Sequence, residues 1–327
     1  MTKTILLHEN AHARVQSRLP KTGDVRFACV NDQGDFQLEG TPIVSQDLAV
    51  DGAWMSLDFM ANTSSRSFAV HALKSKTLTW MQTAAAGLDN AFFQDVMNKG
   101  VRITNSDAQA PAIAEFVMSQ LLMHYHPVKQ RFDAQENHAW TRLAFREISG
   151  GTWTIIGFGN IGQEIGKRAR GFDAHVIGVR RSGGKHAHAN EIVHPDDVRD
   201  LLPKSDVVVL ACPLTDATAQ MGNDAFFQEM KEGSTLINIG RGGLVDEASL
   251  IKGLAVGKPD FAILDVFETE PLPQDNALWD HPQIAISSHT SAFGSGTAAR
   301  GDALFLENLD HFLNGTDFRN EVDPFRL

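Results

Sequence analysis

The stretch TIIGFGNIGQEIG, residues 154–166, decides how the chain is interpreted. Gly157, Gly159 and Gly162 form the pattern G-x-G-x-x-G between an apolar run and a segment with helical periodicity. In such a strand-turn-helix unit, the first glycine permits the tight turn and the second lets the backbone approach a pyrophosphate. The third allows close packing of helix on strand. Because the start of a helix also attracts phosphate, the stretch predicts a dinucleotide-binding site.

Short apolar runs alternate with helix-length segments along the chain, which is typical of α/β proteins. Four runs lie in the first hundred residues, at 4–7, 27–30, 78–81 and 101–104. Six more follow Gly150, at 152–156, 175–179, 207–211, 236–239, 261–264 and 284–287. Their nearly uniform Val, Ile and Leu content suits parallel strands that are buried on both faces. We therefore expect a doubly wound parallel sheet after Gly150 and a separate domain before it.

Length and charge narrow the possible classes of protein. A chain of 327 residues predicts two domains. The 29 Lys and Arg against 40 Asp and Glu give a net charge of −11, which disfavours nucleic-acid binding through bulk charge. The first residues lack the apolar run of a signal peptide, and no later stretch approaches about 18 uninterrupted apolar residues. We expect a cytoplasmic protein with neither membrane nor nucleic-acid partners.

The residues after the run at 175–179 bear on which cofactor binds. An NAD site usually carries Asp or Glu about 20 residues after the glycines, but Arg180, Arg181 and Ser182 stand here. Two guanidinium groups and a hydroxyl can bind a 2′-phosphate through charge-assisted hydrogen bonds. The segment favours NADP over NAD, with solvated surface arginines as the alternative. His186 and His188 nearby lack carboxylate or thiol partners, so we expect no metal site.

Charged side chains follow three successive strands of the predicted sheet. Arg241 follows the run at 236–239, Asp265 and Glu270 follow the next run, and His289 follows the last. Open α/β sheets bind ligands at the carboxyl ends of their strands. Arg241 could hold a substrate carboxylate and polarise the adjacent carbonyl. His289 could exchange a proton with the carbonyl oxygen, while Glu270 orients the ring and favours its protonated form.

Several stretches together resemble the D-isomer-specific 2-hydroxyacid dehydrogenases. They are GGTWTIIGFGNIG, ACPLTDATAQMG, MKEGSTLINIGRGGLVDEASL, LDVFETEPLP and NALWDHPQIAISSHTSA, and the resemblance extends over most of the chain. It implies that Arg241, Glu270 and His289 are the catalytic residues. Ser288 departs from the pattern, because many members carry Pro before the catalytic histidine. Glu270 argues against a formate dehydrogenase, whose members usually carry Gln at that position.

The resemblance also implies contacts with cofactor and substrate. Asp265 matches the family residue that typically contacts the nicotinamide side of the cofactor. The stretch WMQTAAAGLDN resembles the substrate loop, so the backbone of Ala86, Gly87 and Leu88 would bind the substrate carboxylate together with Arg241 and His289. The expected cofactor-binding residues are Gly157, Gly159, Asn160, Ile161, Gly162, Arg180, Arg181, Ser182, Cys212, Pro213, Ile239, Gly240, Arg241 and Asp265.

The family's domain organisation is discontinuous. The resemblance therefore implies a flavodoxin-like substrate domain made of residues 1–104 and 297–327. A Rossmann NAD(P)-binding domain, residues 105–296, would be inserted into it, with the active site in the cleft between them. It also implies a homodimer built on the helix expected at 111–125.

These patterns predict an oxidoreductase that transfers a hydride between NAD(P)H and a small 2-keto acid or D-2-hydroxy acid, similar to the glyoxylate/hydroxypyruvate reductases. Two alternatives stay open. The first is a dehydrogenase that acts mainly in the oxidative direction on another D-2-hydroxy acid or an inorganic analogue. The second is a nucleotide-sensing interaction protein that resembles certain transcriptional corepressors.

Overall fold

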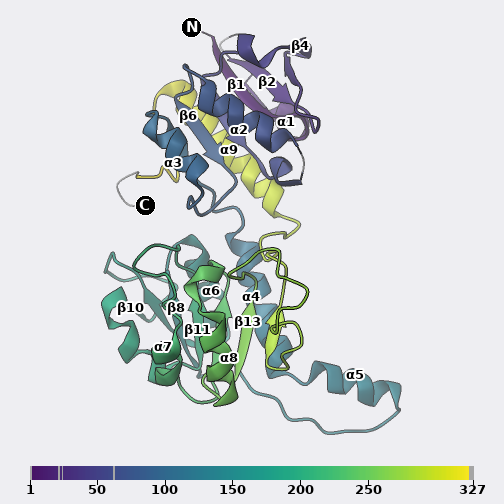
Figure 1. Cartoon of the computed structure of the whole chain (residues 1–327), viewed down its shortest axis with the longest axis vertical. Coiled ribbons are helices and arrows are strands. Elements are labelled where there is room, and N and C mark those ends of the chain that lie inside the picture. The colour runs from purple at the N-terminus through teal and green to yellow at the C-terminus, as the bar shows by residue number, and fades with distance from the viewer. Residues whose placement is uncertain (1, 21–22, 24, 62, 324–327) are drawn as a thin grey trace. The chain divides into compact units, whose positions relative to one another are not determined.

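The computed structural model describes residues 2–20, 23, 25–61 and 63–323. The chain divides into two compact units (Figure 1). Unit 1 comprises Met1–Gln109 and Ser295–Leu327, and unit 2 comprises Ala110–Gly294. Within the described residues, each unit is built on one seven-stranded sheet with helices packed against it.

The sheet of unit 1 has the strand order β4-β3-β2-β1-β5-β6-β7. Its strands are β1 (Lys3–His8), β2 (Val25–Val30), β3 (Phe36–Leu38), β4 (Thr41–Ile43), β5 (Gly52–Met55), β6 (Trp80–Thr83) and β7 (Arg102–Thr104). Strand β3 pairs in the antiparallel direction with both β2 and β4, and the other pairs of neighbouring strands are parallel. The sequence predicted four of these strands, and β3, β4 and β5 are additions.

The helices of unit 1 come from both ends of the chain. They are α1 (Glu9–Val15), α2 (Ser64–Lys74), α3 (Ala91–Asn98) and α9 (Thr297–Asn314). The C-terminal helix α9 packs on this sheet, where Phe305 stacks on Trp54 with ring centroids 4.1 Å apart. Asn308 donates a hydrogen bond to Gln82 at 2.7 Å. The helix ends at Gly315, whose φ of 68° is a left-handed conformation that glycine adopts without strain.

The sheet of unit 2 is wholly parallel, with the order β10-β9-β8-β11-β12-β13-β14. Its strands are β8 (Thr152–Ile156), β9 (His175–Val179), β10 (Glu191–Val193), β11 (Val207–Leu210), β12 (Thr235–Asn238), β13 (Phe261–Leu264) and β14 (Ile284–Ile286). Along β11, Val207 and Val209 enter one apolar core, and Val208 and Leu210 enter the other. This burial on both faces explains the uniform apolar runs, and the predicted doubly wound sheet is confirmed.

The helices of unit 2 cover this sheet. They are α4 (Ala110–Tyr125), α5 (Val128–Glu136), α6 (Asn160–Gly171), α7 (Asp224–Glu229) and α8 (Glu247–Ala255). Ile113 and Val117 of α4 share an apolar core with Ile165 of α6. Among the helices of the described residues, none is long and apolar enough to cross a bilayer.

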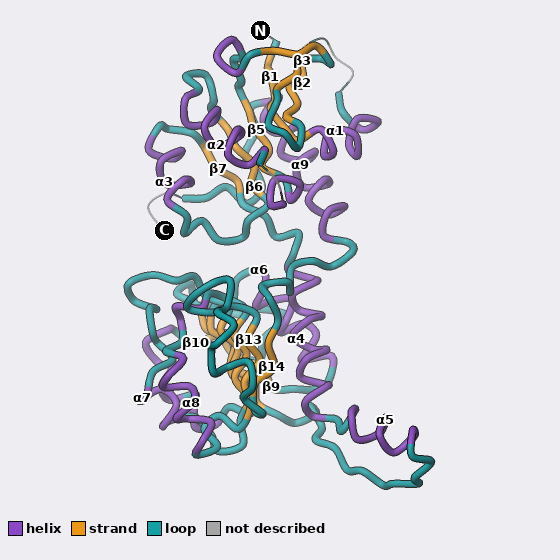
Figure 2. The backbone as a smooth tube through the Cα atoms, turned by 45° about the vertical axis from the view of Figure 1, so that its right-hand side comes forward, coloured by secondary structure: helices purple, strands orange, loops and turns teal. Residues whose placement is uncertain are grey.

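Helix α5 and the loop after it extend away from the sheet of unit 2 (Figures 1 and 2). We call residues 126–145 the arm. No residue of α5 is buried, and Trp140 in the following loop is 95% exposed. At the base of the arm, the Arg146 amide donates to the Tyr125 carbonyl at 3.0 Å. The Arg146 guanidinium also lies 4.5 Å from the centre of the Tyr125 ring, so the arm is closed at its base.

Candidate active site

The predicted catalytic residues follow three neighbouring strands of unit 2. The strands β12, β13 and β14 run in parallel, and their last residues pair in register, Asn238 with Leu264 and Leu264 with Ile286. Their carboxyl ends therefore meet at one edge of the sheet. The loops that carry Arg241, Glu270 and His289 start at this edge, where open α/β sheets bind ligands.

The imidazole of His289 and the carboxylate of Glu270 form a direct contact. His289 Nδ1 lies 2.8 Å from Glu270 Oε2, and both side chains are partly exposed. The other carboxylate oxygen of Glu270 accepts a hydrogen bond from the Phe267 amide at 3.0 Å. Since Nδ1 is engaged with Glu270, the ring presents Nε2 to any other partner, and Nε2 makes no hydrogen bond within the described residues.

Asp265 holds the loop that carries His289. The backbone of His289 has a φ of 53°, an uncommon conformation for a residue with a side chain. Its amide donates to the Asp265 carbonyl at 2.8 Å. The Asp265 side chain accepts hydrogen bonds from Ser287, Thr290 and Ser291, and Asp265 is only 1% exposed. The sequence did not predict this supporting role, and the contact of Asp265 with the nicotinamide side stays a prediction.

Arg241 lies on a loop fixed by its neighbours. The Asn238 side chain accepts from the Gly240 amide at 3.1 Å and donates to the Arg241 carbonyl at 2.9 Å. Arg241 Nη1 donates to the Gly240 carbonyl at 2.8 Å. A Cβ atom on Gly242 would lie 1.8 Å from the Phe267 carbonyl oxygen, so only glycine fits. This close approach brings the Arg241 loop against the loop that follows β13.

The three glycines of the motif each meet a different requirement. Gly157 has a φ of 98°, and a Cβ there would lie 2.4 Å from the Cys212 amide nitrogen. A Cβ on Gly162 would lie 2.5 Å from the Gly157 carbonyl oxygen, so this glycine permits close packing of α6 on the turn. A Cβ on Gly159 would meet nothing within 4 Å. Open space at the middle glycine is what the approach of a pyrophosphate requires.

The start of α6 provides hydrogen-bond donors beside that open space. Gly159 caps the helix without a side-chain hydrogen bond, and the first intrahelical bond runs from the Gln163 amide to Gly159 at 2.8 Å. The amides of Asn160, Ile161 and Gly162 donate to no acceptor within the described residues. Unpaired amides at a helix start bind anions. The turn therefore fits the phosphates of a dinucleotide.

Arg180 directly follows β9. Its Nη2 donates to the Gly183 carbonyl at 3.1 Å, whereas its Nε is buried without a hydrogen-bond partner. Arg181 and Ser182 are exposed. The exposed Arg181 guanidinium and the exposed Ser182 hydroxyl are donors of the kind that bind phosphate oxygens. The described residues contain no group of three side chains that could hold a metal ion.

The loops after β11 and β12 contact each other beside the glycine turn. A Cβ on Gly240 would lie 2.9 Å from the Cys212 carbonyl oxygen. The Cys212 side chain is buried, with its sulfur 4.0 Å from that of Met221, and burial raises the pKa of the thiol to about 11. Cys212 is therefore a neutral thiol within the apolar core of unit 2, and its contact with the cofactor stays a prediction. The Pro213 carbonyl accepts a hydrogen bond from Thr218 Oγ1 at 2.7 Å. The Ile239 amide donates to the Leu210 carbonyl at 3.2 Å.

The predicted substrate loop, Ala86 to Leu88, lies after β6 in unit 1. The Ala85 carbonyl accepts from the Ser106 amide at 3.0 Å, and the Ala86 carbonyl accepts from Asn105 Nδ2 at 2.8 Å. The amides of Ala86, Gly87 and Leu88 donate to no acceptor within the described part of the chain. The loop is thus held through its carbonyls, with its amides available to an anion.

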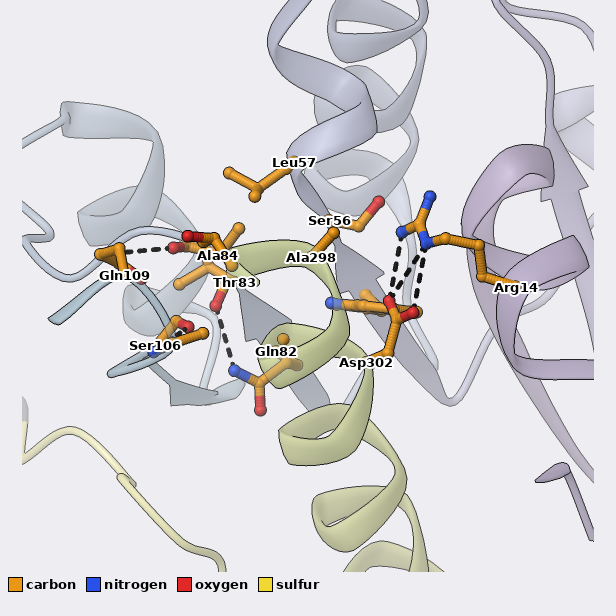
Figure 3. Close-up of a pocket in the computed structure, with 14 residues that line it drawn as sticks. Arg14, Ser56, Leu57, Gln82, Thr83, Ala84, Ser106, Gln109, Ala298 and Asp302 are labelled. Carbon is orange, nitrogen blue, oxygen red and sulfur yellow. Dashed lines mark hydrogen bonds and ion pairs between the residues drawn. The ribbon is translucent and has the colours of Figure 1, made fainter. Parts of the chain in front are cut away.

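A small cavity lies at the same edge of the unit 1 sheet (Figure 3). Ser56, Thr83 and Ser106 line it, and the ion pair of Arg14 and Asp302 borders it, with their nitrogen and oxygen 3.2 Å apart. Its volume of about 20 Å³ admits roughly one water molecule. The cavity is too small for a 2-keto acid.

Comparison with known proteins identifies the family. The profile described as "D-isomer specific 2-hydroxyacid dehydrogenase, NAD binding domain" matches residues 118–291. A glyoxylate reductase from Thermococcus kodakarensis is 32% identical over 250 residues, which cover 73% of this chain and 73% of that enzyme. The chain belongs to the D-isomer specific 2-hydroxyacid dehydrogenase family. It is therefore a member of a family of NAD(P)-dependent dehydrogenases, and the predicted resemblance is confirmed.

Other 2-hydroxyacid dehydrogenases match over different lengths. A hydroxypyruvate reductase from Thermotoga maritima is 35% identical over 60% of this chain and 64% of that enzyme. A D-3-phosphoglycerate dehydrogenase from Methanocaldococcus jannaschii is 30% identical over 76% of this chain, but the match spans only 48% of that longer enzyme. A crystal structure of a family protein from Aeromonas salmonicida has the same fold, with a TM-score of 0.78 and 25% identity over 99% of this chain and 100% of that chain.

Proposed function

We propose that this chain is an NAD(P)-dependent reductase of small 2-keto acids of the glyoxylate and hydroxypyruvate type. His289 is its general acid and base, and Arg241 binds the substrate carboxylate. The contact between His289 and Glu270 at the sheet edge that also carries Arg241 is the observation that supports the proposal most. The names of the glyoxylate and hydroxypyruvate reductases among the relatives support the substrate class.

His289 exchanges the proton in this proposal. Its Nδ1 is held by the Glu270 carboxylate at 2.8 Å, so Nε2 carries the exchange. The protonated ring donates from Nε2 to the carbonyl oxygen during reduction, and the neutral ring accepts the proton back during oxidation. The Glu270 carboxylate fixes the orientation of the ring through its contact with Nδ1.

Arg241 binds the substrate carboxylate in this proposal. The guanidinium can make two parallel hydrogen bonds to a carboxylate, which also draws electron density from the adjacent carbonyl. An α-keto acid carries its carboxylate next to the reacting carbonyl, so one guanidinium can both bind the substrate and position the reacting carbon.

The glycine turn and the residues after β9 would hold the cofactor. The nicotinamide ring, when bound, supplies the hydride that reduces the carbonyl carbon. The unpaired amides at the start of α6 would bind the pyrophosphate. Arg180, Arg181 and Ser182 would bind a 2′-phosphate, and these residues stand after β9 where an NAD site usually carries an acidic residue, which supports NADP over NAD.

We also propose that two copies of the chain associate. The support is the arm, in which Phe132, Trp140 and Phe145 are exposed apolar side chains. A nine-residue helix without buried residues is marginal in water on its own, so contact with another surface would stabilise α5. One chain has a mass of 35.8 kDa. Light scattering at micromolar concentration should give twice this mass. A monomeric mass would contradict this proposal.

The test of the proposed function is the initial rate of coenzyme oxidation. We would compare NADPH with NADH on glyoxylate, hydroxypyruvate, pyruvate and the bulkier phenylpyruvate. Turnover of the small substrates with a preference for NADPH is expected. No turnover on any of the four would contradict the proposal and would favour the oxidative or nucleotide-sensing alternatives. Turnover with NADH alone would contradict only the role given to the arginines.

A further inference from the structure

We infer that Ser291 is a positioning residue for His289, acting through the carboxylate of Asp265. Its hydroxyl holds the loop so that the backbone at His289 stays left-handed and the imidazole stays on Glu270. The catalytic consequence rests on the proposed function, in which His289 exchanges the proton. The structural consequence stands on the loop alone.

The conformation of His289 requires support from outside the residue. A φ of 53° is unfavourable for a residue with a Cβ, and such a conformation persists only where the surroundings fix it. The neighbouring Ser288 is exposed, and its amide and hydroxyl make no hydrogen bond within the described residues. The support must therefore come from the hydrogen bonds between this loop and Asp265.

The two carboxylate oxygens of Asp265 are not supported equally. Oδ1 accepts from Ser287 Oγ at 2.6 Å, from the Thr290 amide at 2.9 Å and from the Ser291 amide at 3.2 Å. Among the described residues, Ser291 alone donates to Oδ2, through its hydroxyl and through its amide at 3.2 Å. Without the hydroxyl, a buried carboxylate oxygen keeps one long, shared hydrogen bond. An under-satisfied buried charge is costly, so the carboxylate or the loop must move.

A movement of the Asp265 carboxylate would displace the backbone on both sides of His289. Asp265 binds Ser287 before the histidine and Thr290 and Ser291 after it, while its own carbonyl accepts from the His289 amide at 2.8 Å. The chain between these points is short, so a shift at Ser291 changes the backbone dihedral angles at His289. The 2.8 Å contact between His289 Nδ1 and Glu270 Oε2 depends on those angles.

Because the two carboxylate oxygens of Asp265 are supported unequally, we expect three serine-to-alanine variants of this loop to lower kcat to different extents. Ser291→Ala should lower kcat for 2-keto acid reduction about tenfold, while KM for the coenzyme changes less than about twofold. Ser287→Ala should cost less, because Oδ1 keeps two amide donors. Ser288→Ala is the matched control and should stay within about twofold of the wild-type kcat. A Ser291→Ala protein with the wild-type kcat would overturn the catalytic part of the inference.

A crystal structure of Ser291→Ala gives a result that does not depend on activity. We expect His289 to leave the left-handed region and the His289–Glu270 contact to open beyond hydrogen-bond distance. A variant that keeps both would overturn the inference even if its melting temperature fell, because that fall would show a purely structural role. If the wild-type enzyme reduced no 2-keto acid, the proposed function would fail, while this structure would still decide the inference.

Discussion

Glu270 Oε2 lies 2.8 Å from His289 Nδ1, although the two residues follow different strands and are 19 positions apart. The contact gives the imidazole a fixed orientation and a negatively charged partner. The role of Glu270 in turnover can therefore be tested without removing the histidine.

Replacing Glu270 by Gln should keep a hydrogen bond to the ring but remove the charge. The ring that donates the proton during reduction then loses its ionic partner. We expect kcat for 2-keto acid reduction to fall about tenfold at a fixed pH, while KM for the coenzyme changes less than about twofold. Glu268→Gln is the matched control, because Glu268 binds the Glu247 amide at 3.1 Å. A Glu270→Gln protein with the wild-type kcat would contradict the assigned role.

The first two glycines of the motif should give opposite results when each is replaced by Ala. Gly157→Ala places a Cβ 2.4 Å from the Cys212 nitrogen on a residue with a φ of 98°, and should lower the free energy of unfolding by about 2–4 kcal/mol. Gly159→Ala meets no atom within 4 Å and should cost less than about 1 kcal/mol. It should instead raise the coenzyme KM about tenfold or more, because the Cβ occupies the space for the pyrophosphate. Denaturant unfolding and coenzyme titration of both variants check this, and equal effects on stability would count against it.

Arg180→Ala and Arg181→Ala test the choice of coenzyme. Each should raise KM for NADPH about tenfold, because each removes a charge-assisted hydrogen bond to the 2′-phosphate. KM for NADH should change less than about twofold. Arg199→Ala is a suitable control, because that exposed guanidinium pairs with Glu229 at 2.8 Å. Equal increases for NADPH and NADH would show that the two arginines do not bind the 2′-phosphate.

His71 in unit 1 should make stability depend on pH. Its buried ring contacts Ser45 Oγ at 2.9 Å, and burial lowers its pKa. In the unfolded chain the ring has a pKa of about 6.5, so below that pH the unfolded chain takes up a proton that the folded chain does not. The contribution of His71 to stability is complete above about pH 6.5 and declines as pH falls towards the lower, folded pKa. The wild-type protein should therefore exceed His71→Asn in free energy of unfolding by less at pH 5 than at pH 7.5. Urea unfolding at both pH values measures this difference. A difference that stays constant between the two pH values would contradict the prediction.

The strands that sequence reasoning found are those with long apolar runs. All six runs after Gly150 became strands, and five of them are buried on both faces, whereas the edge strand β14 is only partly buried. The three-residue edge strand β10 gave no such signal. The β3–β4 hairpin turns at Glu39 and Gly40, with φ of 51° and 78°. A two-residue turn of that kind usually starts with Asn, Asp or Gly, so the glutamate concealed it.

The residues of the candidate site were easier to predict than the contacts among them. The order of apolar runs and charged residues placed Arg241, Glu270 and His289 at strand ends. The hydrogen bonds from Ser287 and Ser291 to Asp265 depend on the register of β13 and β14 and on one left-handed residue. No local pattern in the sequence encodes these, so the supporting role of Asp265 appeared only in the structure.

The measurement that tests the central claim most directly compares wild type with His289→Ala on glyoxylate and hydroxypyruvate at saturating NADPH. We predict that kcat falls by about two orders of magnitude or more, because the general acid is lost. Coenzyme affinity, measured by the fluorescence of bound NADPH, should stay within about twofold, because no part of the proposed coenzyme site is removed. A His289→Ala protein that reduces either acid at the wild-type rate would contradict the account.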